Sequence, residues 1–240
     1  MTLMARFTMP EALPEGPAKV EAVRSMFDAI APRYDLVNRI MTFRLDVRWR
    51  RRTVASLGLP PRSRVADLAC GTGDLCRELD RQGLRPVGVD LSFGMLAAAR
   101  TDAPLIHGDA LRLPFADAAL DGVTCGFALR NFEQLPPAFA ELARITRPGG
   151  RIALLEVAEP PNRLLRAGHG LYFGRVVPLV GGLLSDPAAY RYLPRSVAYL
   201  PETPRLLADL AAAGFADVRR TLLSAGIAQL LTATRAEPGS

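Results

Sequence analysis

The sequence predicts an α/β fold with a doubly wound, mostly parallel sheet. Short apolar segments alternate with helix-like segments through most of the 240 residues, as in chains that build a parallel sheet covered by helices. In addition, an apolar segment ends at Asp67 and leads into a turn with Gly71 and Gly73, followed by a helix. This order is typical of the loop that holds a nucleotide cofactor in open α/β folds.

The length suits one domain with additions. Residues 1–17 are rich in proline and glutamate, and we expect them to be disordered. Residues 18–240 are expected to form a single domain. Within it, residues 18–60 precede the first strand and form N-terminal cap helices. Residues 158–202 are apolar and aromatic and fit no clean strand, so we expect a helical lid.

Apolar spacing and helix breakers set the order of the elements. Pro32 ends the first helix, and the second is interrupted near Thr42. Ser92 caps a short helix, and Gly214 ends the last one. Apart from the short helix after Ser92, the expected helices span residues 18–30, 36–57, 75–82, 136–145 and 204–213. The expected strands span residues 65–67, 86–90, 105–109, 121–127, 151–157, 218–223 and 227–234.

The glycine-rich loop indicates a particular cofactor. Only glycine lets the backbone turn this sharply and come this close to a ligand. The acid in front of the glycines, Asp67, suits a cofactor with a positively charged amino group better than a pyrophosphate, which points to S-adenosylmethionine and methyl transfer. The loop lacks the Gly-Lys-Ser/Thr of a phosphate-binding loop. As a dinucleotide fingerprint it has Cys76 where Gly or Ala belongs; dinucleotide binding and a turn without ligand stay open on the loop alone.

Acids end three successive expected strands, at Asp67, Asp90 and Asp109. Ligands of open α/β sheets lie beyond the carboxyl ends of the strands, so we expect these side chains along one edge of one crevice. Asp90 follows the acid of the first strand by about 20 residues, the distance at which an acid can accept hydrogen bonds from the ribose hydroxyls. Asp109, together with the backbone of Ala110, could hold the edge of the adenine ring. Three acids in this order strengthen the methyltransferase interpretation.

Several segments together resemble the menaquinone/ubiquinone-biosynthesis C-methyltransferases. The resemblance covers most of the chain and rests on residues 26–42, 67–75, 108–115, 129–132, 147–151 and 189–197. It implies a class I S-adenosylmethionine-dependent methyltransferase fold, and methylation of the ring of a reduced polyprenyl quinone precursor such as a naphthoquinol. Including the family contacts it implies, the expected cofactor site comprises Asp67, Gly71, Thr72, Gly73, Asp90, Leu91, Asp109, Ala110 and Gly126.

The chain also departs from this family. At Gly126 relatives often have serine, so only a backbone contact is available, and Ala225 stands where relatives typically have glycine. A methyltransferase of a phenolic or polyketide secondary metabolite therefore remains the alternative function.

Methylation of a quinol ring carbon needs an ionised neighbouring hydroxyl, whose pKa resembles that of a phenol, about 10. Arg130 and Asn131 follow the fourth strand at the same edge. Arg130 either favours the ionised quinol or pairs with an acid and braces the loop; Asn131 orients the oxygen, and Asp35 is a candidate base. The side chains expected to contact the acceptor are Tyr34, Asn38, His169, Tyr190 and Tyr192.

The net charge of +6 comes almost entirely from arginine, with Lys19 as the single lysine. No nucleic-acid motif accompanies this charge, so we expect no nucleic-acid partner, while an anionic membrane surface suits it. The apolar residues 164–184, interleaved with arginines, suit a helix lying on a membrane. Packing of this segment over the site, or a homodimer contact, is the alternative.

The three cysteines form no CxxC pair, and no apolar signal core precedes Glu11. Both observations favour a cytoplasmic protein. If the protein binds lipid, we expect it at the inner face of the membrane, as a peripheral protein. No spacing of histidine, cysteine and carboxylate residues suggests a metal site.

Overall fold

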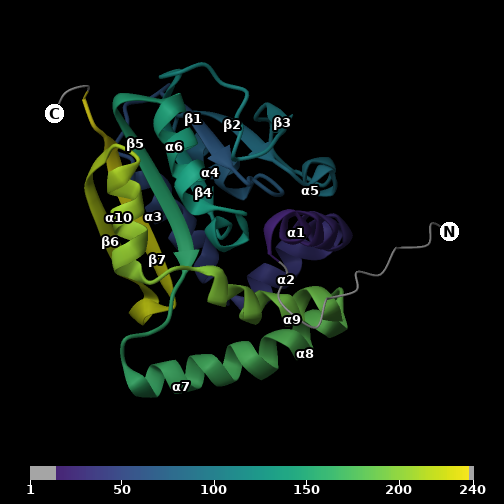
Figure 1. Cartoon of the computed structure of the whole chain (residues 1–240). Coiled ribbons are helices and arrows are strands. Elements are labelled where there is room, and N and C mark those ends of the chain that lie inside the picture. Colours follow the sequence, from purple (N-terminus) through teal and green to yellow (C-terminus); the bar gives the residue numbers. More distant parts are fainter. Residues whose placement is uncertain (1–14, 238–240) are drawn as a thin grey trace.

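The structure, a computed structural model, describes residues 15–237, without the side chains of residues 193 and 194. In this part of the chain seven strands form one sheet in the order β3-β2-β1-β4-β5-β7-β6 (Figure 1). β7 runs antiparallel to both of its neighbours, and the pairs among β1 to β5 are parallel, which confirms the predicted fold class. The strands are β1 (Arg64–Leu68), β2 (Arg85–Asp90), β3 (Leu105–His107), β4 (Leu120–Gly126), β5 (Thr146–Val157), β6 (Phe215–Leu223) and β7 (Ala228–Arg235).

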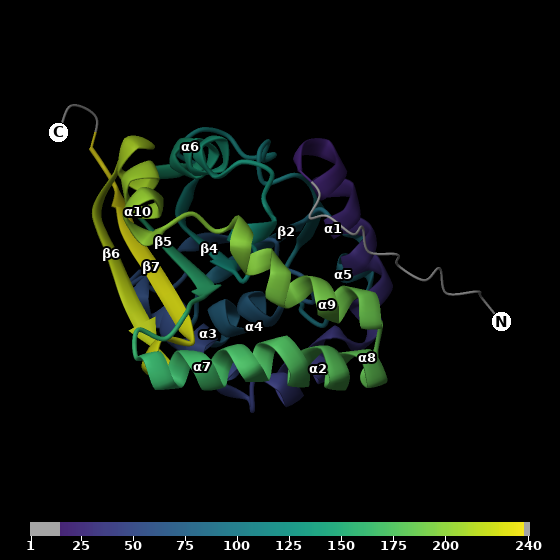
Figure 2. The same cartoon turned by 60° about the horizontal axis from the view of Figure 1, so that its bottom comes forward.

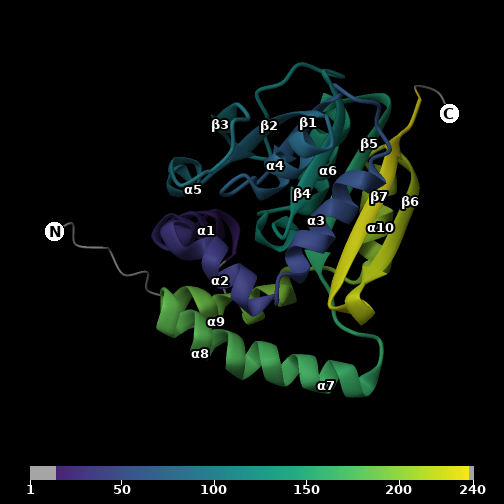
Figure 3. The ribbon, with the colours of Figure 1, turned by 180° about the vertical axis from the view of Figure 1, so that it is seen from behind.

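Helices cover both faces of the sheet and bury two separate apolar cores. On one face α6 (Leu135–Ile145) and α10 (Thr203–Ala212) lie over the strands (Figure 1). On the other face lie α3 (Leu45–Ser56) and α4 (Asp74–Arg81) (Figure 3). These helices bury Trp49 and Leu79 against β1, β5 and β7. The short α5 (Phe93–Ala97) begins after Ser92, whose hydroxyl accepts the Met95 N–H at 3.0 Å, as its cap.

The N-terminal helices lie beyond the carboxyl ends of the strands. α1 (Gly16–Ile30) begins two residues before its expected start and is followed by the short η1 (Ala31–Arg33) and α2 (Tyr34–Met41). Positive φ values at Phe43 and Arg44 separate α2 from α3, which confirms the interruption expected near Thr42. Most of the segment expected to be disordered, residues 1–14, lies outside the described residues; residues 16 and 17 are helical.

Three expected strand boundaries are wrong, and the simplest case is β6, which begins at Phe215 instead of residue 218. β3 ends at His107, so Asp109 lies two residues beyond the strand and forms only an isolated bridge with Arg112. β5 begins at Thr146, five residues early, because the Pro148-Gly149-Gly150 segment is part of the strand. The register between β4 and β5 shifts there, so the segment forms a bulge within β5.

The lid is helical, as expected, and lies beyond the carboxyl ends of the parallel strands, below the sheet in Figure 1 and toward the viewer in Figure 2. It consists of α7 (Arg163–Leu171), a π-helical turn η3 (Tyr172–Val176), α8 (Val177–Leu184), α9 (Pro187–Ser196) and a short η4 (Val197–Tyr199). α7 buries no residue, whereas α9 buries Tyr190 and Tyr192 in a core shared with α1 and α2. Within the described residues no helix combines the length and apolarity that crossing a bilayer requires.

Candidate active site

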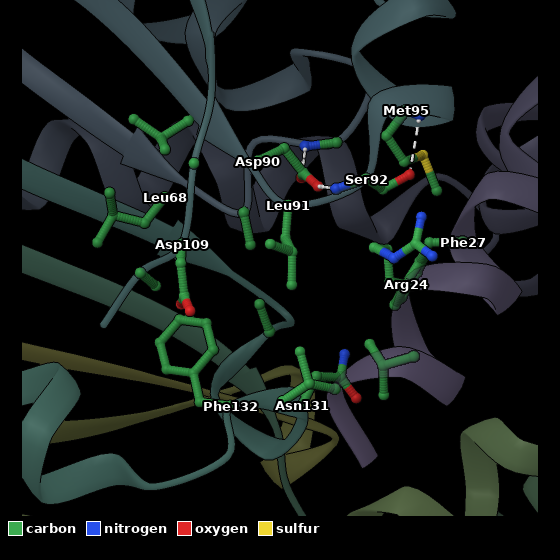
Figure 4. A pocket seen from close by; sticks show the side chains of 18 of the residues that line it. Arg24, Phe27, Leu68, Asp90, Leu91, Ser92, Met95, Asp109, Asn131 and Phe132 are labelled. Carbon is green, nitrogen blue, oxygen red and sulfur yellow. Dashed lines mark hydrogen bonds between the residues drawn. The ribbon is translucent and has the colours of Figure 1, made fainter. Parts of the chain in front are cut away.

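A cavity of about 110 Å³, here called the strand-end cavity, lies at the carboxyl ends of β1, β2 and β4. Asp90, Leu91 and Asp109 line it from the sheet edge (Figure 4). Arg24 and Phe27 of α1 approach from the opposite side, so the N-terminal helix forms its outer wall. Of the expected cofactor residues, the strand-end cavity brings together Gly71, Asp90, Leu91, Asp109, Ala110 and Gly126.

Asp90 is oriented by the backbone around it. One carboxylate oxygen accepts the Gly71 N–H at 2.7 Å and the other accepts the Ser92 N–H at 2.8 Å (Figure 4). Burial raises the pKa of Asp90, and these two N–H donors oppose that rise. Since each carboxylate oxygen can accept more than one bond, Asp90 keeps acceptor capacity for hydroxyl groups in the cavity.

Gly71 and Gly73 are required for two different reasons. Both have positive φ values, 56° and 83°, which favour glycine. A Cβ on Gly71 would have no described atom within 4 Å, so the loop is open at this point. A Cβ on Gly73 would lie 2.6 Å from Thr101 Cγ2, so Gly73 permits close packing and lies outside the strand-end cavity.

Two more expected cofactor residues do not line the strand-end cavity. Asp67 is buried in the sheet, where it accepts from Thr124 Oγ1 at 2.9 Å and from Cys76 Sγ at 3.5 Å. Burial raises the pKa of Asp67 to about 7. Thr72 donates its hydroxyl proton to the carboxylate of Asp35 instead. Both residues therefore support the loop from behind.

A larger cavity of about 430 Å³, the lid cavity, lies between the lid, α2, α3 and β5. Tyr34 and Phe127 line both cavities, so the two adjoin at these rings. Phe127 has a positive φ of 60° directly after β4, which fixes its ring at the boundary. Asn38, Arg130 and His169, all expected at the acceptor, line the lid cavity as well.

Arg130 has a carboxylate partner that the sequence did not reveal. Its guanidinium pairs with Glu156, which is 0% exposed, and donates to the Phe127 carbonyl at 2.7 Å and to Ser196 Oγ at 3.0 Å. Arg130 therefore connects β5, the segment after β4 and the lid. The pairing matches the bracing interpretation, and Arg130 still contributes to the lid-cavity wall. The signal for Glu156 was an acid within the apolar run of residues 152–157.

Tyr34 lies near two guanidinium groups at the boundary of the cavities. Burial raises its pKa, while a hydrogen bond with Asn38 and the positive charges of Arg130 and Arg50 lower it. The net direction is upward, so the phenol keeps its proton near neutral pH and remains a donor. Arg50, which sequence reasoning missed, also lines the lid cavity and pairs with Asp46 and Asp74.

Three residues expected to act on the acceptor lie elsewhere. Tyr190 is 0% exposed with its ring against Gly181, where a Cβ would lie 2.2 Å from Tyr190 Cγ. Tyr192 donates to Asn131 Oδ1 at 3.3 Å. Neither tyrosine lines a cavity described above, because both pack in the lid core. Asp35 lines a third cavity on the far side of α2.

The remaining expected residues do face a cavity. Asn131 lines the strand-end cavity, on the side of the segment after β4 (Figure 4). His169 lines the lid cavity and packs against Phe173, with ring centroids 4.4 Å apart. Burial lowers the pKa of His169, so its imidazole is neutral at neutral pH, and its buried Nε2 has no hydrogen-bond partner among the described residues. Ala225, which stands where relatives typically have glycine, also lines the lid cavity and has a φ of 58°.

Comparisons with known proteins agree with this geometry. A demethylmenaquinone methyltransferase of Roseiflexus sp. (strain RS-1) is 44% identical over 92% of this chain and 96% of its own length. A demethylmenaquinone methyltransferase of Thermus thermophilus is 46% identical over 85% of this chain and 97% of its own. Among solved structures, a SAM-dependent methyltransferase of Thermotoga maritima, described as a possible histamine N-methyltransferase, aligns with a TM-score of 0.61 at 18% identity, over 88% of this chain and 99% of its own.

The last of these supports the fold alone, because its sequence identity is low. The family assignment rests on the sequence: a model of the ubiE/COQ5 methyltransferase family matches residues 16–235, which span the whole sheet and the lid. The chain thus belongs to the ubiE/COQ5 methyltransferase family and is an S-adenosylmethionine-dependent methyltransferase that acts on a small molecule.

Proposed function

We propose that the chain methylates a ring carbon of a reduced polyprenyl quinone precursor, with demethylmenaquinol as the substrate. The observation that carries this proposal is the pair of adjoining cavities that share Tyr34 and Phe127. One has acids at its sheet edge, as a nucleoside cofactor requires, and the other is large enough for an aromatic ring. The names of the two relatives support the choice of acceptor.

The strand-end cavity has the groups that S-adenosylmethionine needs. Asp90 can accept from the two ribose hydroxyls, because its backbone donors already fix its orientation. Asp109 and the backbone of Ala110 would bind the adenine edge, against the apolar side chain of Leu91. The open face of Gly71 leaves room beside the loop. When bound, the cofactor supplies an electrophilic methyl group on its sulfonium.

The residues at the boundary prepare the acceptor. An ionised hydroxyl raises the electron density at the neighbouring ring carbon, and hydrogen-bond donors near that oxygen stabilise the ion. Tyr34 keeps its proton and is therefore a donor at the boundary. The charge of Arg130 is balanced by Glu156, so we assign Arg130 the task of holding Phe127 and the lid in place. Asn131, with its oxygen bonded to Tyr192, has its amide N–H groups left to donate.

We assign His169 as the base that takes the proton from the hydroxyl group of the acceptor. It is neutral, it lines the lid cavity, and its Nε2 has no hydrogen-bond partner in the described part of the chain. Asp35, the other candidate base, is bonded to Thr72 and faces the third cavity.

We further propose that the lid contacts a membrane from which the acceptor is taken. Large apolar side chains on its outer side are exposed, among them Leu164 at 84% and Leu183 at 78%. Leu164 also lines the lid cavity, so the cavity reaches this outer surface, where a polyprenyl tail can leave. Patches of this kind are rare on isolated soluble proteins and mark interaction sites. A homodimer through the same surface is the competing outcome.

Turnover with a labelled methyl donor tests the function. Demethylmenaquinol and a simple phenol without a tail are compared at equal concentration in detergent. We expect methylation of demethylmenaquinol, and a strongly reduced rate for Tyr34→Phe with unchanged binding of S-adenosylhomocysteine. Turnover of the phenol but not of demethylmenaquinol would instead favour the secondary-metabolite function.

A further inference from the structure

A third cavity, about 550 Å³, lies on the opposite side of α2 from the lid cavity. We call it the arginine cavity. It is formed by η1, the outer side of α2, the cofactor loop and the segment after α5, and the residues of its lining that matter here are Arg33, Asp35, Leu36, Arg39, Thr72 and Arg100. The methyl-transfer site described above makes no use of its three arginines.

The charges in the arginine cavity are unbalanced. The nearest carboxylate to Arg39 is Asp74, at 3.8 Å, which is a long ion pair. Arg33 donates to the Leu184 carbonyl at 3.0 Å, and Arg100 forms no ion pair with the described residues. The single carboxylate in the cavity, Asp35, is bonded to Thr72. Three arginines that line a cavity with one carboxylate favour an anion, and the planar donor geometry of a guanidinium group suits a phosphoryl group.

The surroundings indicate what carries that phosphoryl group. Leu36 and Ile40 lie on one side of α2, and Phe43 follows in the turn after this helix; all three are exposed, Phe43 at 75%, and we call them the apolar stripe. At one end of this stripe the ring of Phe43 lies 6.0 Å from that of Tyr172 in the lid. At the other end Arg33 contacts the last residue of α8. The arginine cavity thus borders an apolar surface that continues from α2 onto the lid.

We propose that the arginine cavity binds the phosphoryl head group of an anionic phospholipid while the adjoining apolar stripe and lid rest on the acyl chains. This inference rests on the membrane contact proposed above and gives it a specific lipid. A basic residue close to an anionic bilayer strengthens binding, and a cavity that holds the phosphate adds directional hydrogen bonds to that attraction. The site is separate from the two cavities in which the methyl transfer takes place.

Vesicle sedimentation tests the proposal with a charge-matched control. The full-length protein is mixed with phosphatidylcholine vesicles with or without phosphatidylglycerol. Arg33→Gln/Arg100→Gln is compared with Arg62→Gln/Arg219→Gln, which removes the same charge from exposed arginines that belong neither to the lid nor to the arginine cavity. We expect the first variant to bind phosphatidylglycerol vesicles about tenfold more weakly and the control to change less than about twofold. Equal losses in both variants, or no preference of the native chain for phosphatidylglycerol, would overturn the proposal.

Two further arms separate the alternatives. Calorimetry with inorganic phosphate and with glycerol phosphate is expected to show binding far weaker than to vesicles; free phosphate bound as tightly as the vesicles contradicts a lipid site. Turnover of the acceptor in detergent is expected to stay at the native rate in Arg33→Gln/Arg100→Gln, which also shows that the variant is folded. Absence of turnover in the native chain would refute the proposed function and leave the vesicle result to be judged separately.

Discussion

The strand-end cavity and the lid cavity are built from different kinds of structure. The first lies on the edge of a parallel sheet, where two backbone N–H groups hold Asp90 in place. The second is closed by α7, which buries no residue, and its η3 extension is attached to α2 by one hydrogen bond from Tyr172 to the Met41 carbonyl, at 2.7 Å. Segments with few buried contacts open most easily. We therefore expect the cofactor to meet a fixed site and the acceptor to enter by movement of the lid.

Glu156 joins the two regions, and changing it should have the largest effect. In Glu156→Gln the guanidinium of Arg130 is left as a buried charge without its anionic partner. We expect the free energy of unfolding to fall by about 3 kcal/mol, measured by urea denaturation. The double variant Arg130→Met/Glu156→Gln is the control and should lose less, because no lone charge remains. Native stability in the single variant would show that this pair does not hold the regions together.

Asp90→Ala tests the fixed side of the comparison. The Gly71 and Ser92 N–H groups lose their acceptor, and the ribose loses its carboxylate. Calorimetry with S-adenosylhomocysteine should show affinity reduced by about 100-fold. The exposed Asp102→Ala serves as the matched control and should bind as the native chain does. An unchanged affinity in Asp90→Ala would place the cofactor elsewhere.

Asp67 gives the fixed side a measurable pH dependence. Its pKa is raised to about 7 in the folded chain, compared with about 3.9 in an unfolded one, so the folded state binds more protons in this interval. Stability without cofactor should therefore fall as pH rises from about 4 to 7. The free energy of unfolding at pH 4 and at pH 7 should differ by a contribution from Asp67 on the order of 3 kcal/mol, and this contribution should be missing in Asp67→Asn. Thermal unfolding at several pH values measures this. If the melting temperatures of the native chain and of Asp67→Asn changed with pH to the same extent, the raised pKa of Asp67 would be contradicted.

The smallest effect is expected at the lid. Tyr172→Phe removes the hydrogen bond between η3 and α2 without changing the ring. Net losses for one such bond are about 1 kcal/mol, so the KM for the acceptor should change by less than about tenfold. The affinity of Tyr172→Phe for S-adenosylhomocysteine, measured by calorimetry, should equal that of the native chain. A change in cofactor affinity would mean that the two regions are less independent than the contacts indicate.

The sequence predicted the sheet edge better than the lid, for a physical reason. A strand that runs into a turn is visible as a local pattern, so the places of Asp90 and Asp109 could be inferred from it. Asp67 was also placed at a strand end, but its side chain points toward Thr124 of the neighbouring strand, and which way a side chain points there depends on that strand. Asp67 consequently supports the loop from inside the sheet.

In the lid, spacing could not tell which residues face the cavity. His169 lies on α7 and lines the lid cavity, whereas Tyr190 lies on α9, a separate helix that packs against α1 and α2, and this packing depends on contacts between segments far apart in the chain. Glu156 was missed because its partner Arg130 lies 26 positions earlier in the chain. Their contact exists only once β5 lies beside β4.

The central claim is that an ionised hydroxyl on the acceptor, held at the Tyr34–Phe127 boundary, makes the ring carbon reactive. A methylation assay with a demethylnaphthoquinone in its reduced and its oxidised form, run in parallel with the same labelled cofactor, tests this most directly. We expect methyl transfer to the reduced form and none to the oxidised form, which has no hydroxyl to ionise. Equal methylation of both forms would contradict the claim.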